Sequence, residues 1–130
     1  MAANPLHTDA NAVPSIDDTD LGDVLADLSG IHPGLDLIAD GLRLIAHDRH
    51  SRGQTQTISA ALAGTDSDAV TAIAFTLQRL ADPDTNPSLR ELPLDQQKLI
   101  RLAGEQTAYA LTDPDLHQPA ANIAAAIDGH

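Results

Sequence analysis

The sequence predicts an all-α protein, a single compact bundle of five to seven short-to-medium helices with orthogonal or irregular packing. Apolar residues recur every three or four positions along most of the chain, which is the spacing of one helix face. Aromatic residues make up only 2% of the 130 residues, so the core must be built from Leu, Ile, Val and Ala. Leu and Ala are strong helix formers, whereas a sheet core draws on β-branched and aromatic residues.

The acidic residues also favour helices. Of the 19 acidic residues only Glu91 and Glu105 are glutamates, and the other 17 are aspartates. Asp is a poor residue inside a helix but a good N-cap, because its carboxylate accepts unpaired backbone N–H groups of the first turn. Many aspartates are therefore expected at helix starts. The net charge of -12 repels nucleic acid and attracts basic partners.

Two regions of the chain differ in composition. Residues 1–17 are rich in Ala, Asn, Asp and Pro without periodicity, and we interpret them as a flexible acidic N-terminal tail. Residues 18–130 carry the helical pattern and form the predicted helical domain. Residues 1–20 lack the basic and apolar regions of a signal peptide, and no stretch approaches the roughly 18 apolar residues that a membrane span needs. The sequence therefore predicts a cytoplasmic protein.

Two helices are predicted in the first part of the domain. A short helix from Asp18 ends at Gly30, and a second helix runs from the Pro33-Gly34 region to about Asp48. The second helix has two apolar stripes, and two apolar sides imply two neighbours or one face left for a partner chain. The stripes consist of Leu35, Ile38, Leu42 and Ile45, and of Leu37, Gly41 and Leu44.

A polar loop predicted at residues 49–53 precedes two further helices. The first is short and is closed by Gly64. Residues 65–68 then offer several caps for a fourth helix, and residues 82–87, which contain two prolines, must end it.

The last part of the chain predicts two more helices. A long helix starts at Asp95, which can serve as its N-cap, with Leu94 packing on Leu99 as a hydrophobic staple. A final Ala-rich helix is predicted to start at Pro119 and to end before Gly129.

Cationic side chains concentrate at the end of the second predicted helix, where the helix dipole favours positive charge. A functional reading makes this cluster, with the second apolar stripe, the contact surface for a protein partner. The residues assigned to this surface are Leu37, Arg43, Leu44, His47, Arg49, His50 and Arg52.

The segment from Gln56 onward resembles the repressor type of helix-turn-helix motif, with Ala60, Gly64, Val70 and Ile73 at its small, turn and packing positions. The resemblance implies a DNA-binding regulator. The positions that it places on DNA are Gln56, Ser67 and Thr71, with Arg49 and Arg52 on the phosphate backbone. The segment departs from the motif because Ser59 and Thr65 stand where apolar residues are usual, and Asp66 and Asp68 would face phosphates.

Metal sites find little support in the sequence. His47 and His50 lack a third ligand and a catalytic base, and the chain has no cysteine. Asp82-x-Asp84-x-Asn86 opens like a calcium loop of the EF-hand type, but Pro87 stands where the sharp turn requires Gly. Capping and turn formation explain these residues, so no metal or cofactor is predicted.

The function predicted first is a non-enzymatic interaction or regulatory module, an adaptor or inhibitor that binds a protein partner. Basic partners and a second copy of the chain both fit this prediction. The grounds are the absence of a Gly-x-Ser-x-Gly elbow and of Gly-rich phosphate-binding motifs, the doubled apolar stripe and the acidic surface. The alternatives are the helix-turn-helix regulator and, third, a small enzyme with an unfamiliar site.

Overall fold

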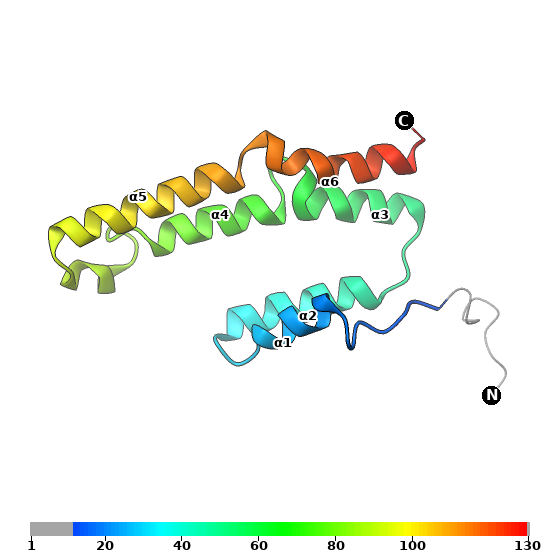
Figure 1. Ribbon diagram of the computed structural model, residues 1–130, viewed down its shortest axis with the longest axis horizontal. Coiled ribbons are helices and arrows are strands. Elements are labelled where there is room, and N and C mark those ends of the chain that lie inside the picture. Colours follow the sequence, from blue (N-terminus) through cyan, green and yellow to red (C-terminus); the bar gives the residue numbers. More distant parts are fainter. Residues whose placement is uncertain (1–11, 130) are drawn as a thin grey trace. The chain divides into compact units, whose positions relative to one another are not determined.

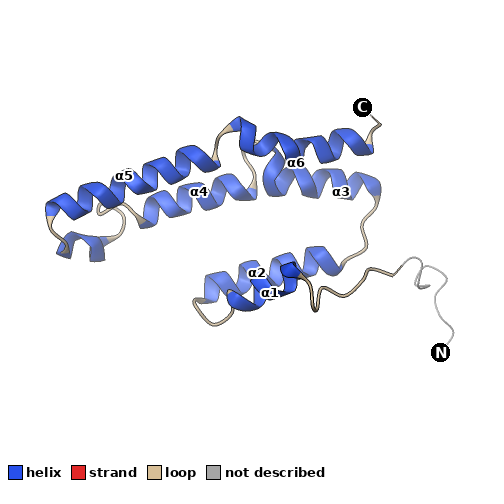
Figure 2. Ribbon diagram, viewed as in Figure 1, coloured by secondary structure: helices blue, strands red, loops and turns tan. Residues whose placement is uncertain are grey.

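The computed structural model describes residues 12–129, and all regular elements in this range are helices (Figure 2). The all-α prediction is confirmed. The helices belong to two compact units, residues 1–50 and residues 51–130. The first unit contains α1 (Asp20–Asp27) and α2 (Pro33–His47). The second unit contains α3 (Arg52–Ser59), the π-helix η2 (Ala60–Gly64), α4 (Ala69–Leu80), the 3₁₀-helix η3 (Pro87–Glu91), α5 (Leu94–Leu111) and α6 (Pro114–Ile127).

In the first unit, local caps define the two helices. The Thr19 side chain accepts a hydrogen bond from the Gly22 amide, and the His32 imidazole accepts one from the Gly34 amide. Gly30 ends the turn after α1 with a φ of 82°, a left-handed conformation that suits glycine. The predicted stop at this residue is confirmed.

The predicted tail lies mostly outside the described residues. Residues 1–11 are not described, and residues 12–16 have no regular structure. The first helix starts at Asp20, two residues later than predicted, because Thr19 supplies the cap.

The second unit consists of two antiparallel helix pairs. The chain runs along α3, η2 and α4, and it returns along α5 and α6 (Figure 1). As a result α4 packs against α5, while α3 and η2 pack against α6. Segments that are far apart in the sequence thus lie side by side.

Three predicted helix boundaries are wrong in this unit, each for a local reason. α3 starts inside the predicted loop at residues 49–53, because Ser51 and Gln54 form a capping box. α5 begins at Leu94 without a side-chain cap, so Asp95 lies in its first turn and is not the N-cap. α6 begins at Pro114 and not at Pro119, because Asp113 caps it by accepting from the Asp115 amide at 2.9 Å.

Small side chains form the contact between α4 and α5. Ala74 on α4 and Ala108 on α5 are both buried. At Gly104 the helices approach so closely that an added Cβ would lie 2.6 Å from the Ala81 Cβ. At this position a larger side chain has no space between the two helices.

Replacing Gly104 by Ala should destabilise the second unit. The new methyl would force α4 and α5 apart, and overpacking of this kind costs about 1–3 kcal/mol, more than the gain of about 0.5–1 kcal/mol from helix propensity. Urea unfolding followed by circular dichroism measures the difference. Gly53→Ala is the control, because no atom lies within 4 Å of its added Cβ and it should be neutral or stabilising. Equal effects of the two substitutions would contradict the close contact.

Candidate functional site

A buried histidine and a buried aspartate meet where the two helix pairs join. His117 on α6 is 7% exposed and Asp68, the N-cap of α4, is 4% exposed. The His117 Nδ1 and an Asp68 carboxylate oxygen are 2.5 Å apart. The His117 Nε2 lies 2.6 Å from the backbone carbonyl oxygen of Leu111, near the end of α5. One imidazole therefore connects three helices.

Capping positions both members of this pair. The carboxylate of Asp68 accepts from the amide of Thr71 at 2.8 Å and from the amide of Thr65 at 3.1 Å, which fixes it at the start of α4. His117 lies in the first turns of α6 because that helix begins at Pro114. Had the helix started at Pro119, His117 would lie outside it.

The surroundings favour the ionised form of both groups. The hydrogen bond to the Leu111 carbonyl raises the pKa of His117 against the effect of burial, and Asp68 raises it further. Burial opposes ionisation of Asp68, but hydrogen bonds from Thr71, Thr65 and His117 outweigh it and lower the pKa to about 2. These shifts favour an imidazolium–carboxylate pair, in which both ring nitrogens donate.

A small pocket of about 220 Å³ lies beside this pair. It is lined by Gly64, Thr65, Asp66, Thr112, Pro114, His117, Gln118 and Ala121. A general base or a metal ligand needs a free lone pair on the imidazole, and both nitrogens of His117 are engaged. In this arrangement the imidazole links α6 to the N-cap of α4 and to the end of α5.

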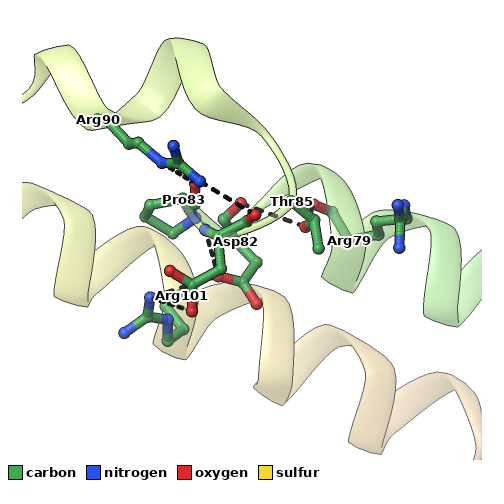
Figure 3. Close-up of polar contacts among 7 residues, drawn as sticks. Arg79, Asp82, Pro83, Thr85, Arg90 and Arg101 are labelled. Atoms are coloured by element: carbon green, nitrogen blue, oxygen red, sulfur yellow. Dashed lines mark hydrogen bonds and ion pairs between the residues drawn. The ribbon is translucent and has the colours of Figure 1, made fainter.

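The calcium-like segment at the other end of α4 pairs with a cationic side chain of α5. The Arg101 guanidinium lies 3.3 Å from Asp82 and 3.5 Å from Asp84 (Figure 3). Within the described residues, no group of three or more His, Cys, Asp or Glu side chains could hold a metal ion. The segment forms a turn whose carboxylates are paired with Arg101.

Other side chains hold the same turn. The Arg90 Nε donates to the Pro83 carbonyl at 2.8 Å, and the Thr85 hydroxyl donates to the Arg79 carbonyl at 2.6 Å (Figure 3). Pro83 itself is buried. The connection between α4 and α5 is therefore fixed by side-chain bonds to backbone carbonyls.

The predicted partner-contact residues fall in both units. Leu37 and Leu44 on α2 are 72% and 63% exposed, and the Arg43 guanidinium pairs with Asp40 at 3.5 Å. His47 is exposed in the last turn of α2.

The remaining members of the predicted surface lie beyond α2. His50 bonds through Nε2 to the Ile45 carbonyl at 2.7 Å. Arg49 is exposed in the connection after α2, whereas Arg52 starts α3 in the second unit. The structure thus does not bring all seven residues together on one helix.

The segment that resembles a helix-turn-helix spans the end of α3, η2 and the start of α4. η2 packs against α4, while α3 also packs against α6 and α4 against α5. The Gln56 amide donates to the Ala124 carbonyl and to Asp128, and Thr71 is 7% exposed. Ser67 is exposed, so the structure does not place the three predicted DNA contacts on one accessible surface.

The pair of His117 and Asp68 could not be predicted from the sequence. Asp68 is one of several cap candidates at residues 65–68, and 49 residues separate it from His117. The available signal was Asp113-Pro114, an N-cap followed by the residue favoured at the first helical position. A helix started there carries His117 in its first two turns.

Comparisons with known proteins give no relative: no family model, no curated protein and no solved structure matches the chain. Among the described helices, none has the length and apolar character required to cross a membrane.

Asp68→Ala should strongly destabilise the second unit. The substitution removes the cap of α4 and leaves the His117 imidazolium buried without its counter-ion, and breaking a buried pair typically costs about 3–5 kcal/mol. Asp66→Ala changes an exposed aspartate of the same turn, so it should alter stability by less than about 0.5 kcal/mol. Chemical unfolding of both variants measures the contrast. Similar losses for the two variants would contradict the special role of Asp68.

Stability should also depend on pH with a defined sign. In the folded chain the pKa of His117 is raised above 6.5. Its contribution to the free energy of unfolding is therefore complete below about pH 6.5 and is lost as the pH rises through the pKa of the folded state. The contribution of Asp68 is present above pH 3.8 and is lost as the pH falls toward 2. Thermal melting at a series of pH values should therefore show a decline on the alkaline side. His117→Leu should abolish this decline and His47→Gln should retain it, whereas a flat wild-type profile between neutral and alkaline pH would contradict the assignment.

Proposed function

We propose that the chain is a non-enzymatic interaction module that assembles with a second copy of itself through one face of the α4–α5 pair. The observation that carries the proposal is a partly exposed, largely apolar face without charged residues. This uncharged face consists of Val70, Ile73, Leu77 and Leu80 on α4 and of Ile100, Ala103, Thr107 and Ala110 on α5.

Helical periodicity identifies this face. Ala74 on α4 and Gly104 and Ala108 on α5 are buried in the contact between the helices. The residues that directly precede them, such as Ile73 and Ala103, are turned to one side of the contact. Two antiparallel helices are related by a local two-fold axis that is perpendicular to the plane containing both helix axes. Residues that directly precede the buried contact residues therefore lie on the same face of the pair in both helices.

Several apolar side chains on this face are exposed to solvent. Ile73, Leu77 and Leu80 are 45%, 39% and 56% exposed, and Leu99 at the edge is 65% exposed. The contact between α4 and α5 cannot take in these side chains, because it is made by small residues at close range. Contiguous exposed apolar surface of this kind typically marks an interaction site.

Charge favours a second copy as the occupant. The chain has a net charge of -12, so most surfaces of two copies repel each other. The helices α4 and α5 carry five charged residues, and by helical periodicity none of them lies on the uncharged face. They are Arg79, Asp95, Lys98, Arg101 and Glu105. Two copies can thus meet there without bringing like charges together.

Two such pairs packed face to face form a four-helix bundle with a two-fold, isologous interface. The strip is about 18 Å long, the length of α4, and about 20 Å wide for two adjacent helices. This is smaller than a standard permanent interface, so the dimer should dissociate on dilution.

Sedimentation equilibrium over a range of concentrations tests this proposal. The wild-type chain should pass from monomer to dimer, and Leu80→Glu should raise the dissociation constant at least about tenfold, because it buries a carboxylate in an apolar interface. Phe75→Glu is the matched control. Phe75 lies on the same helix and is 57% exposed, against 56% for Leu80. It directly follows the buried Ala74 and therefore lies on the other face of the helix pair.

The Phe75→Glu variant should dimerise like the wild type, and all three chains should have the same helix content by circular dichroism. A wild-type chain that stays monomeric at the highest concentration would overturn the proposal. So would equal weakening by the two substitutions.

A further inference from the structure

The two helix pairs of the second unit meet at a narrow junction. One connection is the turn at residues 65–68 between η2 and α4, and the other is the short link at residues 112–113 between α5 and α6. The direct packing across the junction is that of η2 against α4. The described bonds that tie α6 to α4 and to the end of α5 are those of His117.

We propose that this junction is a pH-sensitive hinge, closed while the His117 imidazole carries two protons and loosened when it loses one. The inference concerns the chain itself and does not depend on dimer formation. It rests on the geometry of a ring placed between two acceptors.

The neutral ring cannot satisfy both acceptors. With two protons, it donates to the Asp68 carboxylate and to the Leu111 carbonyl. With one proton, either nitrogen that lacks it directs a lone pair at an oxygen only 2.5 or 2.6 Å away. The ring must then move away from one acceptor, so α6 is released either from the cap of α4 or from the end of α5.

Among the described residues of the second unit, the charged side chains nearest this ring are acidic. Asp68 faces the ring from α4, and Asp66 lines the same pocket from the preceding turn. On α6 itself, Asp113 and Asp115 occupy the cap and the first turn. Residues 53–64 of α3 and η2 include no titratable side chain, and from α5 the ring meets a backbone carbonyl. These neighbours thus favour the charged form of the ring, and none of them supplies a positive charge in its place once the ring is neutral.

The structure provides a body that can move and space for the ring. η2 and α6 are in close contact, because a Cβ on Gly64 would lie 3.2 Å from the Ala121 nitrogen. The Gln56 amide also bonds α3 to α6 at 3.1 Å through the Ala124 carbonyl. α3, η2 and α6 are therefore expected to swing together, and the pocket of about 220 Å³ beside His117 can take the displaced ring.

A distance measurement between spin labels tests the hinge. The chain has no cysteine, so Thr57→Cys on α3 and Ala72→Cys on α4 introduce two unique, exposed labelling positions, one on each side of the junction. Labelled chains are diluted with unlabelled chains, so that only distances within one chain are read. Electron–electron double resonance is recorded between pH 6 and pH 9, and NMR of the imidazole nitrogens follows the protonation of His117 over the same range.

The distance distribution should be narrow while His117 is charged and broader once it is neutral, with a midpoint at the pH where the ring titrates. His117→Gln should give a distribution that does not change with pH. His47→Gln should give the same pH dependence as the labelled chain that keeps all its histidines. A ring that titrates without a change in the distribution would overturn the proposal. Broadening at a pH unrelated to the His117 titration would also overturn it, and both outcomes are readable without the His117→Gln variant.

Discussion

The second unit depends on the carboxylate of Asp68. A single side chain caps α4, fixes the preceding turn through Thr65 and neutralises the buried His117 of α6. Each of these tasks is common in helical proteins, but here they meet at one residue that is 4% exposed. Because the buried apolar core is small, polar bonds of this kind set the register between the two helix pairs.

Small residues determine how the helices pack and what remains outside. Glycine and alanine at the α4–α5 contact let the two backbones approach, and the leucines and isoleucines are displaced to the flanks. The small residues that allow α4 and α5 to pack closely therefore also leave an apolar face at the side of the pair. A sequence with so few aromatic residues has few other ways to fill the space between helices.

The fold class and most helix segments could be predicted from the sequence, because periodicity and caps are local signals. Gly30, Asp68 and Gly64 ended or began helices where the pattern placed them. The start of α6 was misplaced because two prolines competed for the same role, and only Asp113 supplies a cap. The His117–Asp68 pair could not be derived, because it depends on which helices pack together.

Gln56 has a consequence for the order in which the unit assembles. Its side chain bonds to Ala124 and Asp128, 68 and 72 positions later, whereas Arg101 of α5 reaches Asp82 across only 19 positions. Closing the short loop costs less chain entropy, so α4 and α5 can pair while the rest is still unstructured. On a ribosome, α3 can therefore form its bonds to α6 only after residues as far as Asp128 have been synthesised.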